Sequence, residues 1–244
     1  MLYFEDRVRK FEYKLNDTDD QIIDYIVKNR KQVVNASIQS LAANLFTVPN
    51  TIIRFSKKLG YDGYAHLKNS LKEELHSEPE KQEDSLQYNL KTTFDLIDVD
   101  IIEKVSKMIY EAKRVLFFGV GDTALFCEMM TKNLKIAGKE SDFYIHRHEI
   151  IHGINQLNNE GILFLISLSG ETSQVLEVAE LGKEKGIKII SLTHFDRNAL
   201  QKLADVNLFC FTPKKLLNGY NITDKTPLMA IIRTLSEFYW DFTK

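Results

Sequence analysis

The sequence predicts two domains of different fold class, an all-α domain followed by an α/β domain with a five-stranded parallel sheet. Three observations support this prediction. In residues 1–76, apolar residues recur at helical spacing and no segment alternates as a strand does. In residues 93–244, short apolar runs alternate with helical segments, as they do in βαβ units. Residues 77–92 between them are polar and charged, which predicts an interdomain linker.

The first two helices of the N-terminal domain are predicted from their caps and their periodicity. Thr18 and Gln21 have the spacing of a capping box, so we expect a helix to begin there. A second helix is expected in SIQSLAANL, with Ser37 as its N-cap. The apolar residues expected to face inward from these helices are Ile22, Ile23, Ile26, Val27, Ile38, Leu41 and Leu45.

Two further helices complete the N-terminal domain. The segment PNTIIRFSKKLG predicts a third helix, because Pro49 suits its first position and Gly60 suits its C-terminal stop. A fourth helix is expected from about Tyr64. Its inward face is expected to carry Leu67, Leu71 and Leu75.

In the C-terminal domain, a helix in DVDIIEKVSKMIYEAK leads into the first of five strands. The strands are predicted at residues 115–118, 143–145, 162–167, 187–192 and 206–211. The helices between and after them are predicted at residues 124–136, 149–157, 173–185, 197–203 and 228–242. Because the strands show no polar alternation, helices are expected to cover both faces of the sheet. This is the arrangement of a flavodoxin-like α/β sandwich.

Composition narrows the class of protein. With 44% hydrophobic and 27% charged residues in 244, the chain has the make-up of a soluble globular protein, and its net charge of −2 gives no indication of a nucleic-acid partner. Cys127 and Cys210 lie in apolar segments without a metal-binding or redox spacing, so we expect buried free thiols and a cytoplasmic protein. No apolar run is long enough to span a membrane, and MLYFEDRVRKFEYKL lacks the apolar stretch of a signal peptide.

The segment SLAANLFTVPNTIIRFSKKLGY has the layout of a helix-turn-helix. In that motif the second helix enters the major groove of DNA, and the residues at its start face the base edges. Those residues are Asn50, Thr51 and Arg54. Since asparagine pairs with adenine and arginine with guanine, they suit base recognition.

The charge around this segment supports the same prediction. Residues 47–72 hold five basic side chains and one acidic side chain, a net charge of +4, whereas residues 1–46 are neutral. A helical bundle with a solvated basic face is the alternative, because such motifs are short and match by chance. Val48 cannot cap the second helix, although Thr47 can do so with a shifted boundary. The side chains expected at DNA phosphates are Lys57, Lys58, Lys68 and Lys72.

The loop after the first strand, FFGVGDTA, contains Gly119, Gly121 and Thr123. Taken alone, it matches the dinucleotide-binding pattern GxGxxA, with Glu140 or Asp142 as the acidic residue near the next strand. A dinucleotide-binding fold does not need a hydroxyl cluster after its third strand. The loop after the third strand therefore favours another ligand.

That loop, ISLSGETSQ, carries four hydroxyls within seven residues. Strands one and three flank the point where ligands bind in such a sheet, so both loops are expected to face one crevice. Its hydroxyls are expected from Thr123, Ser167, Ser169 and Thr172, and its amides, at a helix N-terminus, from Gly170, Glu171 and Thr172. Such a set favours a phosphate group. Neither loop contains lysine or arginine, which favours a small monophosphate ester over a triphosphate.

Several of these residues have simpler structural interpretations. Ser173 suits a helix cap, Gly121 suits turn geometry, and Glu171 suits the first turn of a helix, where its charge matches the dipole. A metal site is not predicted from His146, His148 and His152, because their spacing spans a strand end and a helix start. A contact from His148 or His152 to the sugar is the preferred hypothesis.

Taken together, SLSGET and the helix ending in EKGIKIISLTHFDRNALQKLADV resemble the phosphosugar-binding core of the SIS (sugar isomerase) domain, and GVGDT resembles its first loop. The stretch TIIRFSKKLGYDGYAHLK is similar to the helix-turn-helix of RpiR/MurR-type transcriptional regulators. The combination covers nearly the whole chain. The resemblance implies that Thr123, Ser167, Ser169 and Thr172 contact phosphate and that Glu171 meets the sugar. It also implies that Arg54 and its neighbours contact DNA.

The chain departs from the pattern of these regulators at several positions. Val48 stands in place of the usual serine, and Thr123 stands where serine is common. His148 is kept, but His146 and Ile150 replace a more usual aspartate and glutamine. The identity of the ligand is therefore not transferred.

The leading hypothesis is a cytoplasmic transcriptional regulator that binds a double-stranded DNA operator and senses a sugar phosphate, without catalysis, a metal or a cofactor. A homodimer or a dimer of dimers is expected, since helix-turn-helix readers pair two half-sites. The alternative is an aldose–ketose isomerase with an accessory helical domain, in which Glu171, His148 or His152 is the general base. A third possibility is an interaction module whose helical domain only dimerises, which an absence of salt-dependent DNA binding would favour.

Overall fold

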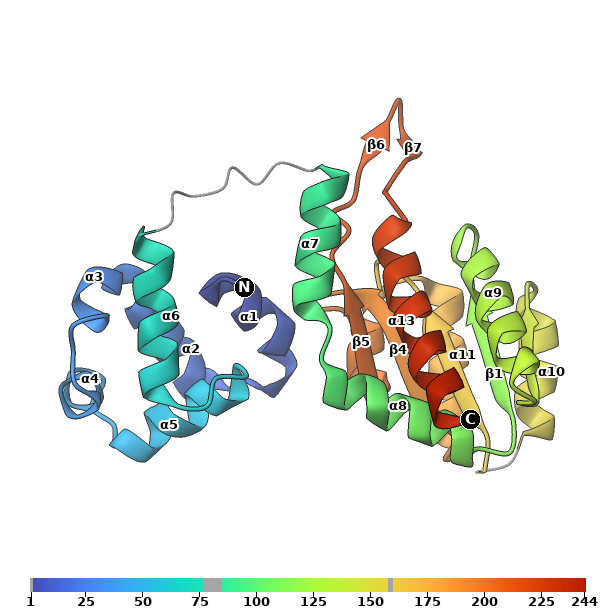
Figure 1. Cartoon of the computed structure of the whole chain (residues 1–244), viewed down its shortest axis with the longest axis horizontal. Coiled ribbons are helices and arrows are strands. Elements are labelled where there is room, and N and C mark those ends of the chain that lie inside the picture. Colours follow the sequence, from blue (N-terminus) through green and yellow to red (C-terminus); the bar gives the residue numbers. More distant parts are fainter. Residues whose placement is uncertain (1, 77–84, 158–159) are drawn as a thin grey trace. The chain divides into compact units, whose positions relative to one another are not determined.

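The computed structural model describes residues 2–76, 85–157 and 160–244 of the chain (Figure 1). The chain divides into two compact units, Met1–Glu83 and Asp84–Lys244. The first is helical, and the second contains a parallel sheet between helices, which confirms the predicted fold class.

The N-terminal unit is a bundle of short helices around one apolar core. Large apolar side chains from successive helices meet there, among them Phe4, Ile26, Leu41, Phe55 and Leu67. Its elements are α1 (Phe4–Phe11), the 3₁₀ turn η1 (Glu12–Lys14), α2 (Asp17–Lys28), α3 (Arg30–Val33), α4 (Ile38–Asn44), α5 (Pro49–Lys58) and α6 (Tyr64–His76).

The start of this unit differs from the sequence prediction. The capping box of α2 is formed by Asn16 and Asp19 rather than by Thr18 and Gln21: the Asn16 side chain accepts from the Thr18 and Asp19 amides at 3.1 Å, and the Asp19 carboxylate accepts from the Asn16 amide at 3.0 Å. Two residues expected to face inward, Val27 and Leu75, are exposed. Helix α1 was not predicted, although Phe4, Val8 and Phe11 do have helical spacing.

The second unit is built on a five-stranded parallel sheet of order β2-β1-β3-β4-β5. This is the flavodoxin-like order, so all five predicted strands are confirmed, with ends shifted by one or two residues. The strands are β1 (Val115–Gly119), β2 (Ser141–Tyr144), β3 (Ile162–Ile166), β4 (Lys188–His194) and β5 (Val206–Cys210). The helices are α7 (Leu86–Leu96), α8 (Val99–Glu111), α9 (Thr123–Ile136), α10 (Arg147–Gln156), α11 (Ser173–Glu184), α12 (Ala199–Leu203) and α13 (Thr226–Phe242).

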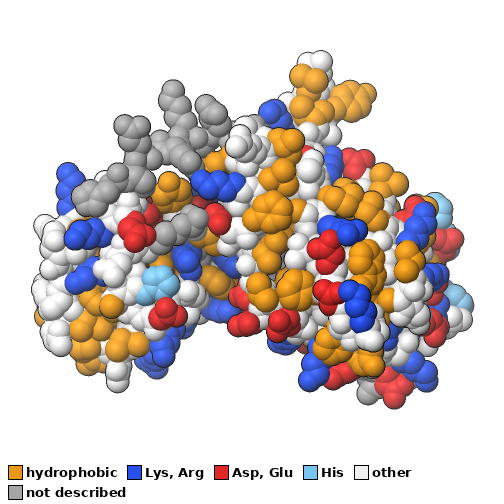
Figure 2. Space-filling view, viewed as in Figure 1, with side chains coloured by type: hydrophobic (Ala, Val, Ile, Leu, Met, Phe, Trp, Pro, Cys, Tyr) orange, Lys and Arg blue, Asp and Glu red, His pale blue; other side chains and the backbone are white. Residues whose placement is uncertain are grey.

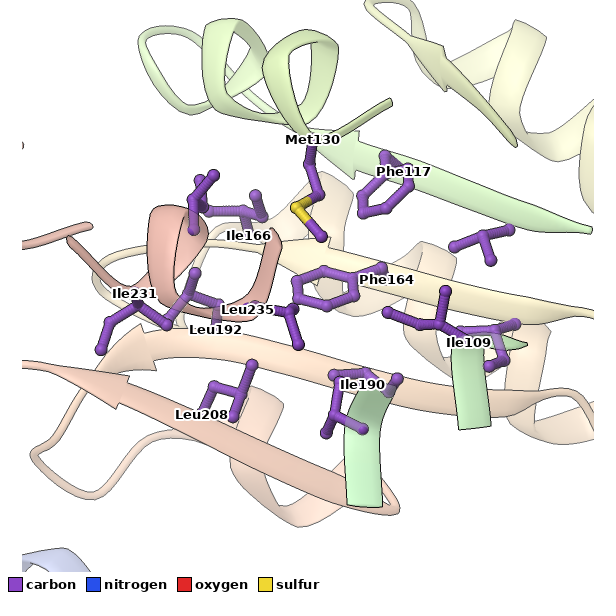
Figure 3. Close-up of a cluster of buried hydrophobic side chains, with 14 of the residues drawn as sticks. Ile109, Phe117, Met130, Phe164, Ile166, Ile190, Leu192, Leu208, Ile231 and Leu235 are labelled. Atoms are coloured by element: carbon purple, nitrogen blue, oxygen red, sulfur yellow. The ribbon is translucent and has the colours of Figure 1, made fainter. Parts of the chain in front are cut away.

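Alternate residues of the strands bury their side chains in two separate cores. Helices α8, α9 and α13 cover one face, where Phe117, Phe164 and Leu192 pack with Met130 and Leu235 (Figure 3). Helices α10, α11 and α12 cover the other face. Because both faces are apolar, the strands show the continuous runs from which the sheet was predicted.

Helix α7 occupies part of the segment that the sequence predicts as a linker, residues 77–92. Its buried face carries polar side chains, Asn89, Thr92 and Thr93, and the Thr93 hydroxyl oxygen accepts a hydrogen bond from the Phe211 amide at 2.9 Å. The helix packs against α13 and β5. Since Leu96 is the one apolar residue among the four buried ones of this helix, apolar periodicity could not reveal it. Residues 77–84 of the predicted linker lie outside the described residues.

Between β5 and α13 the chain forms a hairpin, β6 (Leu216–Leu217) and β7 (Tyr220–Asn221), that the sequence did not predict. Asn218 and Gly219 turn it, both with positive φ, and its apolar side chains are exposed at the surface (Figure 2). Cys127 and Cys210 are buried free thiols, and burial raises the pKa of Cys210 to about 12. Within the described residues, no helix combines the length and the apolar character needed to cross a membrane.

Candidate functional site

The two predicted ligand-binding loops lie side by side at the carboxyl edge of the sheet. β1 and β3 are hydrogen-bonded neighbours, and Gly119 at the end of β1 is paired with Ile166 at the end of β3. The loops Val120–Thr123 and Ser167–Thr172 therefore leave the sheet from adjacent positions. Each leads into a long helix, α9 or α11, whose first-turn amides have no acceptor within the helix. Both helix dipoles favour negative charge at this edge.

Two hydroxyls of the second loop are hydrogen-bonded to each other, and a third accepts from a backbone amide. The Ser167 and Thr172 hydroxyl oxygens are 3.1 Å apart, and Ser169 Oγ accepts from the Glu171 amide at 3.2 Å. Ser167 is buried, Thr172 is half-buried and Ser169 is exposed. The loop thus presents hydroxyls at increasing depth from solvent to the sheet, which suits an anion that enters from solvent.

Gly170 makes the tight shape of this loop possible. Its φ is +62°, and a Cβ placed on it would lie 2.0 Å from Asn198 Oδ1. Its amide donates to the Ser167 carbonyl at 3.0 Å, and its own carbonyl accepts from the Leu200 amide at 3.0 Å. The Gly170 and Glu171 amides have acceptors inside the loop, and the Val175 and Leu176 amides donate to the Thr172 carbonyl. The amides left for a ligand at the start of α11 are therefore those of Thr172, Ser173 and Gln174.

Glu171 has a structural partner in this arrangement. Its Oε1 accepts from the Ala199 amide at 2.6 Å, so the carboxylate caps the start of α12. The side chain nonetheless belongs to an exposed residue at the rim of the loop. The sequence expectation that Glu171 meets a sugar or acts as a base would require it to share or leave this hydrogen bond.

The first loop contributes a glycine turn and a buried hydroxyl. Gly121 has φ +65° and is exposed. Thr123 is buried, and its hydroxyl donates to the Val120 carbonyl at 3.0 Å, which leaves the oxygen able to accept a second hydrogen bond. The dinucleotide interpretation expects an acidic residue near the end of the second strand, but Glu140 and Asp142 lie at the start of β2. Both contact Arg114, whose Nε is 3.5 Å from Glu140 Oε1 and 3.0 Å from Asp142 Oδ2.

Neither loop contains a basic residue, but a lysine from a distant part of the chain contacts the first loop. Lys225 precedes α13, about a hundred residues further along the chain, and its Nζ lies 2.7 Å from Asp122 Oδ2. The Lys225 side chain is 21% exposed and Asp122 is 65% exposed. Position along the sequence gave no signal for this contact, because only the packing of α13 brings Lys225 to this edge.

The predicted histidines lie at the start of α10, beyond the end of β2. His146 and His148 are exposed, and their rings stack with centroids 5.6 Å apart. His152 lies one turn further on and is also exposed, with its Nε2 2.9 Å from the Gln156 side-chain nitrogen. Among the described residues, no hydrogen bond, ion pair or ring contact joins His148 to either loop. No group of three or more His, Cys, Asp or Glu in those residues is arranged to hold a metal ion.

The helix-turn-helix of the N-terminal unit is formed by α4 and α5. Ser37 caps α4, with its side chain accepting from the Ser40 amide at 3.1 Å, and Leu41, Ile52 and Phe55 bury the contact between the helices. Val48 is the N-cap of α5 and makes no capping hydrogen bond. The helix boundary is therefore not shifted to make Thr47 the N-cap.

The predicted DNA-binding residues divide into two groups. Asn50, Arg54 and Lys57 are exposed on α5, and Thr51 is half-buried. By contrast, the Lys58 and Lys68 ammonium groups bind partners inside the N-terminal unit. Lys58 Nζ lies 2.5 Å from the buried Asp19 carboxylate, and Lys68 Nζ donates to the Ala36 carbonyl at 3.4 Å.

Comparisons with known proteins agree with both halves of this description. The SIS domain profile matches residues 108–236, and the profile described as a helix-turn-helix domain of the rpiR family matches residues 3–78. The HTH-type transcriptional regulator GlvR of Bacillus subtilis is 27% identical, and the match covers 99% of this chain and 96% of GlvR.

Two solved structures share the fold. The Vibrio vulnificus NanR protein complexed with ManNAc-6P superposes with a TM-score of 0.60 at 23% identity, over 97% of this chain and 90% of that one. A putative phosphosugar isomerase involved in capsule formation from Bacteroides fragilis superposes with a TM-score of 0.55 at 25% identity, over 65% of this chain and 87% of that one. The chain therefore belongs to the rpiR family of helix-turn-helix transcriptional regulators with a C-terminal SIS domain.

Proposed function

We propose that this regulator binds a duplex operator through α5 and senses a sugar phosphate through the loops that follow β1 and β3. The observation that carries the proposal is the meeting of two hydroxyl-bearing loops and two helix N-termini at one edge of the sheet. A phosphate monoester is the ligand class that such donors favour. The ligand named for NanR, ManNAc-6P, is a sugar phosphate, which supports the same class here.

Within this site we assign the phosphate to the hydroxyls of Thr123, Ser167, Ser169 and Thr172 and to the amides of Thr172, Ser173 and Gln174 at the start of α11. Gly121 and Gly170 shape the two loops around it, as their positive φ values require. Glu171 and His148 remain the candidates for contacts to the sugar. The Lys225 ammonium group supplies the positive charge that the loops lack.

Binding without turnover is the function we favour. An isomerase needs a general base that moves a proton between two carbons, and the Glu171 carboxylate is held by the Ala199 amide. The likeness to a putative phosphosugar isomerase keeps catalysis as the second candidate. The purified protein should therefore be incubated with a panel of aldose and ketose phosphates. Interconversion of any of them would favour the enzyme.

We also propose that the protein acts in the cytoplasm as a homodimer or a dimer of dimers. Its DNA target and its two buried free thiols fit a reducing compartment. A helix-turn-helix reader presents one recognition helix per half-site, so two copies are needed for a palindromic operator. The mass of the full chain in solution, measured by light scattering, tests this proposal.

The first test of DNA binding is Arg54→Ala. If the exposed Arg54 pairs with a guanine, its loss weakens binding to the operator by ~1–3 kcal/mol and relaxes the base preference at one position. The change should leave thermal stability unaltered. Binding is measured by fluorescence anisotropy on a duplex that the protein selects from a random pool. Equal affinity of the two proteins for that duplex would remove Arg54 from the interface.

The test of the phosphate site compares Lys225→Met with Asp122→Asn. Both changes break the same ion pair, but only the first removes the cation. A charged hydrogen bond contributes about 1.5–3 kcal/mol, so Lys225→Met should weaken sugar-phosphate binding by at least tenfold. Asp122→Asn frees the Lys225 ammonium group from its ion pair, so this variant should bind the sugar phosphate as tightly as the wild type or more tightly. Titration calorimetry separates them, and a parallel loss in both variants would show that the pair acts only in folding.

A further inference from the structure

The turn between α4 and α5 exposes two large apolar side chains. Phe46 is 98% exposed and Val48 is 60% exposed, and Val48 is the N-cap of α5. Neither residue belongs to the apolar core of the N-terminal unit. Their side chains therefore do not stabilise the fold by burial.

Both residues also weaken the local backbone. Phe46 has φ +51°, in the left-handed region where a Cβ is strained and glycine is favoured. Val48 occupies a position where serine, threonine, asparagine or aspartate would accept a hydrogen bond from the first turn, and it offers no acceptor. Two neighbouring departures that each forgo stability and each expose apolar surface point to a contact outside the domain.

The surroundings of Val48 identify that contact as DNA. Val48 is the N-cap of α5. In a helix-turn-helix, the residues at the N-terminus of the second helix face the base edges in the major groove. Asn50, Arg54 and Lys57 follow it on the same helix with exposed side chains. This polar and basic helix complements a polyanion and does not suit burial in an apolar protein interface. Within the major groove, the apolar group that a small aliphatic side chain meets is the C5 methyl of thymine.

We infer that Val48 reads a thymine by contact with its C5 methyl group, as the apolar member of the surface formed by Asn50, Arg54 and Lys57. The inference rests on the proposed DNA-binding function. It adds a base preference that the polar residues of α5 do not supply. It also gives a reason for valine where a capping residue would make the helix more stable.

The experiment uses the full chain and a duplex selected by it from a random pool, resynthesised with deoxyuridine in place of each thymidine in turn. Deoxyuridine keeps the hydrogen-bonding groups of thymine and removes only the methyl. We expect one or more positions in each half-site at which this change weakens binding about fourfold, the value for one methyl-sized group. Val48→Ser should bind the thymidine and deoxyuridine duplexes equally. Val48→Thr keeps one methyl at the same place and should retain part of the preference for the thymidine duplex.

Two controls make the outcome specific. Val48→Ser supplies the missing cap and should raise the melting temperature, so a loss of discrimination cannot come from unfolding. Arg54→Ala should weaken binding to both duplexes while preserving their ratio. The inference would be overturned if the wild type bound every duplex equally. It would also be overturned if Val48→Ser kept the full ratio of affinities for the thymidine and deoxyuridine duplexes. Either result would leave the proposed function standing. Failure of the wild type to select any DNA would overturn both.

Discussion

Gly170→Ala is expected to destabilise the C-terminal domain by about 3 kcal/mol and to abolish sugar-phosphate binding. Two costs add at this position. An alanine must adopt φ +62°, at roughly 1–2 kcal/mol, and its Cβ would overlap the Asn198 side chain at 2.0 Å, at roughly 1–3 kcal/mol. Asn198 cannot move away freely, because it is buried and its Oδ1 caps α12 by accepting from the Gln201 amide at 3.0 Å.

The measurement is a thermal melt with and without a panel of sugar phosphates. A loss of about 3 kcal/mol corresponds to a fall of roughly 6–12 °C for a domain of this size. A bound ligand at 100 times its dissociation constant stabilises by about 2.7 kcal/mol, and this gain should be present in the wild type and absent in the variant.

Gly138→Ala is the matched control. Gly138 has φ +79°, but nothing lies within 4 Å of the position its Cβ would take. This variant should lose only about 1 kcal/mol and keep its response to ligand. If the two variants lost equal stability, the close approach of Asn198 would not be what makes glycine necessary at residue 170.

Lys58→Met is expected to destabilise the N-terminal domain by about 2–3 kcal/mol while leaving the salt dependence of DNA binding unchanged. Lys58 Nζ lies 2.5 Å from Asp19 Oδ2, and the Asp19 side chain is only 5% exposed. Removing the lysine leaves a buried carboxylate without its cation. The loss is smaller than for a fully buried pair, because the Lys58 side chain is 32% exposed and water can reach the site.

Lys57→Met, at the next residue, should show the opposite behaviour. Lys57 is exposed on α5, so its loss should change stability by no more than about 0.5 kcal/mol. If Lys57 contacts a phosphate, the slope of binding affinity against salt concentration falls by about 1. Chemical denaturation and anisotropy at several salt concentrations measure both quantities. If fully folded Lys58→Met protein showed a smaller slope of binding affinity against salt concentration, Lys58 would also contact DNA.

The sequence predicted the sheet well because its residues carry the signal locally. Each of the five strands is an apolar run such as ILFLI, since both faces of the sheet are covered, and the helices between them have apolar residues at helical spacing. The order β2-β1-β3-β4-β5 is that of the expected flavodoxin-like sheet, in which the first and third strands flank the ligand-binding point. Helix α7 was hidden for the opposite reason, because its buried face carries Asn89, Thr92 and Thr93.

The candidate site was predictable as far as its loops. The hydroxyls of Ser167, Ser169 and Thr172 lie within six consecutive residues, so sequence spacing alone brings them together. What each functional group is bound to was not predictable. The Glu171 carboxylate is held by an amide 28 residues away, and Lys58 by a carboxylate 39 residues away.

By itself, then, the sequence determined the two fold classes, the family, the helix-turn-helix and the pair of loops that share one edge of the sheet. These properties depend on local periodicity and on motifs whose residues are near neighbours along the chain. Only the tertiary structure decided which lysines remain exposed on α5 and that Lys225 stands beside Asp122. Such pairings depend on how helices pack, and packing joins residues whose separation along the chain carries no record of the contact.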